Sequence, residues 1–166
     1  MVTCTFCGAP VSPRDPSCSY CGRSNQRHQP STHHVQALLS GARTLHQAAN
    51  HIAAIVLFRQ VIAEDPELFD AYFFLADSLT SLHDFSAAIQ AMERAQSIRP
   101  GHFAVQYNLG ALHKRQGNAP LARHHFERSL EIAKSAAGDH ESFRAMVEQE
   151  LASLPPKGHP GGGHVH

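Results

Sequence analysis

The stretch FDAYFFLADSLTSLHDFSAAIQAMERAQSIRPGH, residues 69–102, carries a pattern that continues through the residues on either side of it. Pro66 and Pro100 lie 34 positions apart, and alanines at positions 54, 88 and 122 follow the same period. A bulky residue follows each alanine by four positions, as Phe58, Met92 and Phe126. A small residue followed one helical turn later by a large one lets two antiparallel helices approach closely and fills the gap beside their contact. The period therefore predicts stacked helix pairs.

This pattern resembles the tetratricopeptide repeat family, in three units at residues 35–68, 69–102 and 103–136. The middle unit carries packing residues at the spacing that the family uses, namely Tyr72, Leu75, Ala76, Leu79, Ala88, Met92, Ala95 and Pro100. Because such repeats cannot bury their apolar faces alone, we expect a capping helix over residues 139–154. The resemblance implies an all-α fold, a right-handed solenoid of three helix pairs plus this helix, in a domain from 35 to 154.

The resemblance also implies a concave groove, lined by the first helix of each repeat, that binds a peptide or a helix of a partner protein. By the period, the groove residues are Leu39, Arg43, His46, Asp70, Phe73, Asp77, Tyr107, Asn108, Ala111 and Lys114. Three of them, Leu39, Phe73 and Tyr107, recur at an offset of 34, which predicts an apolar ladder along the groove. The alternative is that these three side chains only cover a neighbouring helix.

All four cysteines lie near the start of the chain as two Cys-x-x-Cys pairs, Cys4 with Cys7 and Cys18 with Cys21. Such a turn directs two thiolates at one ion, and two turns complete the tetrahedral shell that zinc prefers. Four thiolates leave no coordination position for water or substrate, so the ion would be structural. The segment resembles the small bacterial zinc-ribbon family, which implies a zinc ribbon at residues 1–24 with one structural Zn²⁺. Redox chemistry at one pair is the alternative, although no βαβ pattern surrounds it.

The segments outside these two units are polar or rich in glycine. Residues 25–34 are polar and interrupted by Pro30, which predicts a flexible linker that lets the ribbon move independently. Residues 155–166 are rich in Gly, Pro and His and are expected to be disordered. Three histidines of this tail, His159, His164 and His166, offer a possible second metal site, which is weak because ordering a tail costs entropy. A tail without function is the other interpretation.

The charges of the chain cancel, since Lys plus Arg and Asp plus Glu both total 14. Broad attraction to nucleic acid or to an anionic membrane is therefore not expected. Arginines 14, 23 and 27 near the ribbon nevertheless leave a nucleic-acid-associated factor as one alternative function, and the tail histidines leave a metal-delivery or assembly accessory protein as another.

Several sequence patterns typical of membrane proteins, secreted proteins and enzymes are missing from the chain. It contains no apolar stretch that predicts a membrane span and no signal-peptide pattern, so we expect a cytoplasmic protein with reduced thiols. Nucleophile motifs, phosphate-binding loops and HExxH patterns are missing, so we expect no enzyme activity. The leading interpretation is a non-catalytic adaptor or scaffold whose groove binds a partner protein. The sequence leaves the oligomeric state open.

Overall fold

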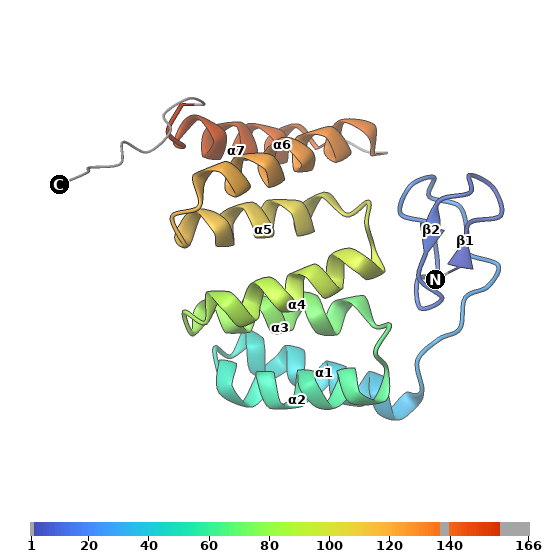
Figure 1. Cartoon of the computed structure of the whole chain (residues 1–166). Helices are drawn as coiled ribbons and strands as arrows, with labels where there is room; N and C mark the ends of the chain where they lie inside the picture. The colour runs from blue at the N-terminus through green and yellow to red at the C-terminus, as the bar shows by residue number, and fades with distance from the viewer. Residues whose placement is uncertain (1, 137–139, 157–166) are drawn as a thin grey trace.

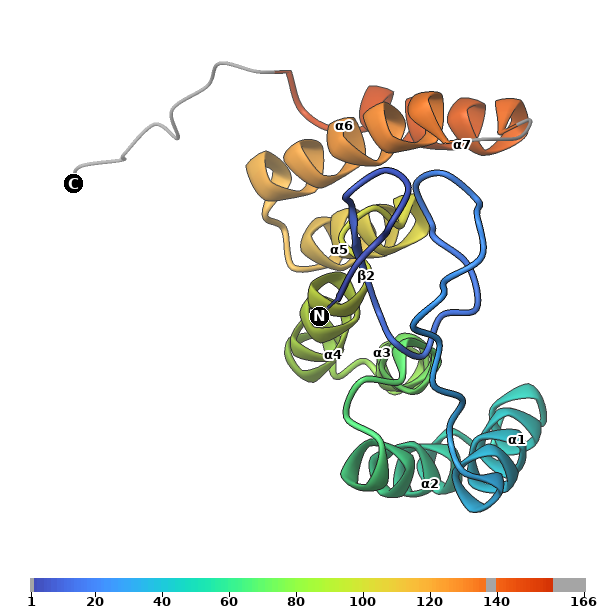
Figure 2. The same cartoon turned by 90° about the vertical axis from the view of Figure 1, so that its right-hand side faces the viewer.

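The computed structural model describes residues 2–136 and 140–156, and these residues hold seven helices and one pair of short strands (Figure 1). Six helices form three antiparallel pairs in chain order: α1 (His33–Gln47) with α2 (His51–Glu64), α3 (Phe69–Ser81) with α4 (Phe85–Ile98), and α5 (Phe103–Arg115) with α6 (Ala119–Ser135). The pairs stack on one another and turn as they stack (Figure 2).

The helix crossings are built as the period of the sequence predicts. The alanines at 54, 88 and 122 are 0% exposed, and the three bulky residues that follow them are almost completely buried. The close approach is visible in the third pair, where a Cβ atom added at Gly110 would lie 2.6 Å from Cδ1 of Phe126. The predicted pairing of three first helices with three second helices is therefore confirmed.

The turn inside each pair also repeats. The residue directly before the second helix of every pair is an Asn or Asp that caps it. Its side chain accepts a hydrogen bond from the backbone amide three residues later, and the three caps are Asn50, Asp84 and Asn118. Each is preceded by a residue with a positive φ, which is Ala49, His83 or Gly117. A polar N-cap satisfies an amide that has no partner inside the helix, so the three turns stop one helix and start the next in the same way.

Helix α7 (Glu141–Ala152) covers the end of the stack, in agreement with the predicted capping helix. Its Val147 is fully buried, and Phe143 and Leu151 pack beside Tyr107 and Ala111 of the third pair. The predicted start at residue 139 lies outside the described residues.

The N-terminal residues 2–24, called the four-cysteine module below, contain β1 (Val2–Thr3) paired antiparallel with β2 (Pro10–Val11). The module lies at the ends of the helices, beside the loops that join α2 to α3 and α4 to α5 (Figure 1). Two residues of the predicted flexible linker, residues 25–34, are hydrogen-bonded to the module. The Asn25 side chain donates to the carbonyl of Asp15 at 2.9 Å, and the Gln29 amide donates to that of Pro13 at 2.7 Å.

The first helix begins at His33, within the predicted linker. The division of the chain into domains stays a prediction. No helix in the described part of the chain is long and apolar enough to cross a lipid bilayer.

Candidate functional site

The four cysteine side chains converge on one point. The Sγ atoms of Cys4 and Cys21 lie 3.7 Å apart, as do those of Cys7 and Cys18, and all four sulfurs lie within 4.8 Å of one another. A tetrahedral shell with metal–sulfur bonds of about 2.3 Å puts neighbouring sulfurs about 3.8 Å apart. The four cysteines are therefore compatible with a site for a single metal ion.

Two equivalent turns produce this convergence. The amide of Gly8 donates to the carbonyl of Cys4 at 2.9 Å, and in the second turn the amide of Gly22 donates to the carbonyl of Cys18 at the same distance. The φ angles of Gly8 and Gly22 are +72° and +70°, a left-handed conformation that glycine adopts without a Cβ clash. Each glycine thus lets the backbone fold back so that both sulfurs of its pair point inward.

Two thiols of this cluster, those of Cys4 and Cys7, have pKa values shifted in opposite directions. Hydrogen bonds from the backbone amides of Cys7 and Phe6 lower the pKa of Cys4 to about 6. The amide of Ala9 lowers the pKa of Cys7, but burial and the three neighbouring sulfurs outweigh it and raise that pKa to about 12. Like charges at this spacing oppose one another, so four thiolates require a cation among them.

A hollow of about 170 Å³ opens between α3 and α5, in the layer of first helices. It is lined by Asp77, Thr80, Met92, Tyr107, Asn108, Ala111, Leu112 and Arg115. Four of these, Asp77, Tyr107, Asn108 and Ala111, belong to the groove residues expected from the sequence. Met92 and Leu112 are buried core side chains, so they give the hollow an apolar floor.

Sequence reasoning missed Thr80 and Arg115 at this hollow. Thr80 lies 34 positions after His46 and 34 before Lys114, both of which were expected in the groove, so the same period points to it. Arg115 follows Lys114 directly on the last turn of α5. Because both residues sit at the ends of their helices, the packing pattern of the repeat does not include them.

Helix α1 contributes a separate shallow hollow of about 300 Å³, lined by Gln36, Leu39, Ser40, Arg43, Thr44 and Gln47. Leu39 is half-buried against the core, and the guanidinium of Arg43 lies 5.1 Å from the ring centroid of Phe74. These two predicted groove residues therefore lie together on α1, apart from the hollow between α3 and α5.

His46 joins α1 to α3 through both ring nitrogens. Its Nδ1 lies 2.9 Å from Oγ of Ser78, and its Nε2 lies 3.1 Å from Oδ2 of Asp77. A serine, a histidine and an aspartate in contact resemble a hydrolytic triad, but Ser78 is 0% exposed and no substrate reaches its hydroxyl. The contact thus links two helices.

Two aromatic residues of the expected ladder, Phe73 and Tyr107, make ring contacts within the stack. Phe73 lies 5.5 Å from Phe69 of its own helix α3, whereas Tyr107 lies 5.6 Å from Phe126 of α6 and 5.7 Å from Phe143 of α7, measured between ring centroids. Both side chains are half-buried. Tyr107 thus contacts two adjacent helices and also borders the hollow, and whether the ladder binds a partner or covers helices stays open.

The last two expected groove residues, Asp70 and Lys114, lie in the first turn of α3 and in the last turn of α5. Asp70 approaches the guanidinium of Arg99 at 4.0 Å, beside the four-cysteine module. Lys114 binds Glu150 and Ser153 at the end of the capping helix, both at 2.7 Å from its Nζ atom. The binding role of all ten residues stays a prediction. The three tail histidines, His159, His164 and His166, lie outside the described residues.

Comparisons with known proteins agree with this architecture. The chain resembles the type III secretion chaperone SycD of Yersinia enterocolitica in complex with a peptide of the translocator YopD, with 13% identity over 74% of this chain and 92% of that one and a TM-score of 0.69. It also resembles PcrH in complex with the chaperone binding region of PopD, with 17% identity, 74% and 91% coverage and a TM-score of 0.69. At these identities the likeness shows the fold, an all-α stack of helix pairs.

PcrH from Pseudomonas aeruginosa gives 18% identity, coverage of 75% and 93%, and a TM-score of 0.67. No curated protein sequence matches the chain. The profile of the tetratricopeptide repeat family matches residues 39–103 and again residues 76–139, which together span more than half of the chain. The chain therefore belongs to the tetratricopeptide repeat family.

Proposed function

We propose that the chain is a non-catalytic adaptor that binds a peptide or helix of a partner protein at the hollow between α3 and α5. The observation that carries this proposal is the combination of an apolar floor, made by Met92 and Leu112, with polar walls that remain open to solvent. A site of this kind accepts one apolar side chain of a ligand and orients its backbone by hydrogen bonds.

The walls supply the polar groups that such a ligand requires. The side-chain amide of Asn108 offers both donors and an acceptor, which matches a peptide bond. Asp77, with a side chain 56% exposed, and the exposed Arg115 add opposite charges to the same hollow. These charges favour one orientation of a polar segment over the reverse. The complexes of SycD with a peptide of the translocator YopD and of PcrH with the chaperone binding region of PopD support a peptide as ligand.

The four-cysteine module in this proposal holds one structural zinc ion, and the thiols are kept reduced in the cytoplasm. The sulfur–sulfur distances of 3.7 Å support zinc, and the closed set of four sulfurs supports a structural role.

The nucleic-acid alternative is weakened by the contacts of two of the three arginines on which it depended. Arg14 is bound to Asp65, and the guanidinium of Arg23 lies 4.6 Å from the ring centroid of Phe6. The metal-delivery alternative depends on tail histidines outside the described residues, so the described part of the chain adds nothing to it.

The binding proposal is tested with a display library of random twelve-residue peptides, selected against the zinc-loaded full chain. Selected peptides are then titrated by fluorescence anisotropy against the wild-type chain and the variants Asn108→Ala and Ala111→Arg. We expect their affinity to fall at least about tenfold, because one variant removes the amide and the other fills the hollow. Gln90→Arg, at an exposed position of the second-helix layer on α4, is the control and keeps full affinity.

Peptides that bind all four proteins equally would show that the hollow is not the binding surface. A selection that enriches no peptide would count against peptide binding altogether. Circular dichroism of each variant separates loss of the site from loss of the fold.

A further inference from the structure

We propose that the four-cysteine module is a metal-dependent clasp on the repeats: metal binding organises the module, and the organised module binds the loops between the repeats, so that each event strengthens the other. This inference rests on the zinc assignment in the proposed function and does not depend on the peptide site. It is carried by two ion pairs whose carboxylates are buried, one hydrogen bond to a backbone carbonyl and one close aromatic contact between the module and the loops.

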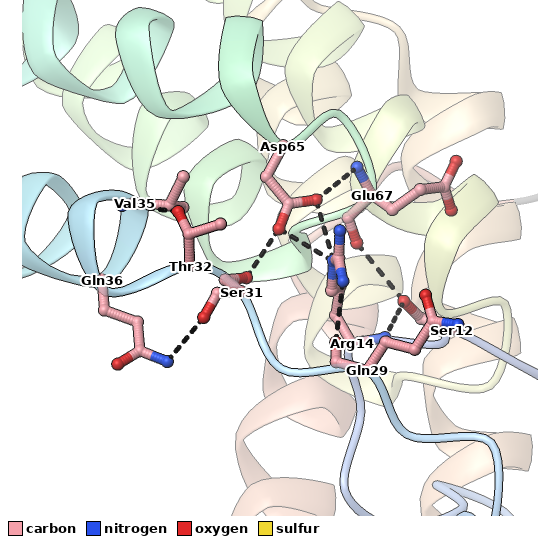
Figure 3. A network of polar contacts seen from close by, with 9 residues as sticks. All are labelled: Ser12, Arg14, Gln29, Ser31, Thr32, Val35, Gln36, Asp65 and Glu67. Carbon is pink, nitrogen blue, oxygen red and sulfur yellow. Dashed lines mark hydrogen bonds and ion pairs between the residues drawn. The ribbon is translucent and has the colours of Figure 1, made fainter.

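The first ion pair joins Arg14 of the module to Asp65, which ends α2. Nε of Arg14 lies 2.8 Å from Oδ2 of Asp65, and the residue Asp65 is only 2% exposed. Figure 3 shows Asp65 at the centre of a network in which it also accepts a hydrogen bond from Ser31 Oγ at 2.6 Å. Ser12, fully buried, donates to the carbonyl of Glu67 in the same loop at 3.3 Å. The α2–α3 loop is therefore bound by Ser12 and Arg14 of the module and by Ser31 of the segment that follows the module.

The second ion pair joins the next residue of the module, Asp15, to Arg99, which ends α4. Nε of Arg99 donates to Oδ2 of Asp15 at 2.7 Å, and a second bond joins Nη2 to Oδ1. Asp15 is 3% exposed, and the guanidinium of Arg99 also stacks 4.1 Å from the ring centroid of Phe69. A two-pronged contact of arginine with a buried carboxylate fixes orientation as well as distance.

The order of these charges allows one register. Asp65 and Arg99 stand at the same position of successive repeats, and they face the adjacent residues Arg14 and Asp15. Moving the module by one repeat would bring Arg14 to Arg99, and two like charges away from water repel strongly. The module is therefore specific for the two loops that join the three helix pairs.

The contact residues depend on the metal for their arrangement. Ser12, Arg14 and Asp15 lie in the segment between the two cysteine pairs, and the buried core of the module consists of Cys4, Val11 and Cys18. A core so small cannot organise a chain segment by itself, so cross-linking of the cysteines through an ion supplies most of the folding free energy. Without the ion, Arg14 and Asp15 lose their shared geometry, and Asp65 and Arg99 lose their partners.

An aromatic contact adds a probe that involves no charge. Tyr20, between the cysteines of the second pair, packs on Gly101 of the α4–α5 loop, where an added Cβ would lie 2.5 Å from the Cζ atom of the ring. Gly101→Ala therefore displaces the Tyr20 ring and disturbs this contact between the module and the loop without touching either ion pair.

The experiment measures the zinc dissociation constant of the full chain by competition with a chromophoric chelator. The variants are Asp15→Asn, Arg99→Gln and Gly101→Ala, with Arg59→Gln, an exposed arginine on α2, as the control. We expect the constant to rise about tenfold or more in the three interface variants and to stay unchanged in the control, because coupled binding events share their free energy reciprocally. Asp15→Asn is nearly isosteric, so it preserves the fold of the module.

Hydrogen exchange of the backbone amides tests the same coupling in the opposite direction, namely whether removing zinc loosens the loops between the repeats. Removing zinc from the wild-type chain should speed exchange at Leu68, Ala71, His102 and Val105, whose amides are bonded within the two loops and the first turns of α3 and α5. Amides of α7 should not change. An unchanged zinc constant in all three interface variants, or loop exchange that ignores zinc, would overturn the clasp while leaving the zinc site intact. A wild-type chain that binds no zinc would overturn both, and peptide binding would still be decided by its own titration.

Discussion

Asp65 and Arg99 occupy the same position in successive repeats, carry opposite charges, and bind the neighbouring residues Arg14 and Asp15 of the four-cysteine module. Each directly follows the second helix of its pair, and each belongs to an ion pair in which the carboxylate is buried and the arginine is partly exposed. Repeats that are otherwise alike are thus distinguished by the sign of one charge. That difference positions the module on the stack.

Replacing Asp65 by alanine should destabilise the protein far more than replacing the preceding residue, Glu64. Asp65→Ala leaves Arg14 without its carboxylate, but Arg14 has a side chain 26% exposed and can regain water. We therefore expect a loss of about 2–3 kcal/mol in the free energy of unfolding, below the roughly 3–5 kcal/mol of a fully buried pair. Denaturant unfolding of the zinc-loaded chain measures it.

The matched control for this change is Glu64→Ala. Glu64 is exposed and pairs with His34 at 3.2 Å on the surface, so its loss should cost less than about 0.5 kcal/mol. Equal effects of the two substitutions would mean that the Asp65 network does not stabilise the fold.

Two glycines in first helices should respond to alanine with opposite signs. At Gly110, a Cβ would lie 2.6 Å from Phe126, so Gly110→Ala should cost about 1–3 kcal/mol by overpacking, reduced by the higher helix propensity of alanine. At Gly41, the nearest atom is Leu57 Cδ1 at 3.5 Å, an ordinary contact. Gly41→Ala should therefore stabilise the chain by up to about 1 kcal/mol.

Thermal unfolding of the two glycine variants beside the wild type checks both signs at once. A stabilised Gly110→Ala chain would show that the α5–α6 crossing is looser than the structure has it.

The protein should lose stability in mild acid partly through His125. Burial, and then the neighbouring His113 and His124, lower the pKa of His125 to about 4 in the folded protein, against about 6.5 for an unfolded chain. Between about pH 6.5 and pH 4 the unfolded chain binds a proton that the folded chain does not, so the free energy of unfolding falls as the pH falls. Below about pH 4 this contribution levels off.

Urea unfolding of wild type and His125→Gln across that range isolates the contribution of His125, because all other groups titrate in both proteins. The variant should show the shallower fall. His33→Gln, at an exposed histidine of α1, should reproduce the wild-type slope. A variant curve parallel to the wild type would place the acid sensitivity elsewhere.

The sequence predicted the repeats well because their packing is local and periodic. The alanines at 54, 88 and 122 and their bulky partners meet within one helix pair, so the period alone is enough to find them. The convergence of the four cysteines was also predictable, since two equivalent turns produce it.

The docking of the four-cysteine module was not predicted, because its contacts join positions far apart in the chain, from Arg14 to Asp65 and from Asp15 to Arg99. No sequence period relates the residues of the module to the residues of the repeats that they contact. From the sequence, Arg14 belongs with Arg23 and Arg27 near the ribbon, and nothing there relates it to Asp65. The only signal was the reversal of charge between positions 65 and 99 of two matching repeats.

The hollow was predicted in part for a similar reason. Asp77 and Ala111 share an offset of 34 and were expected, but whether an aromatic residue faces solvent or a neighbouring helix depends on the next repeat and on α7. Tyr107 is covered by Phe143 of α7, a helix with no counterpart inside the repeat.

The most direct test of the adaptor is a cross-linking map with a peptide selected from the library. A photoreactive benzoylphenylalanine is introduced at Thr80, on the wall of the hollow, and separately at Gln90, on the exposed face of α4. A hollow that binds the peptide predicts a cross-linked product from position 80 and none from position 90. A product from position 90 alone, or from both positions equally, would contradict the proposal that this chain binds its partner through the layer of first helices.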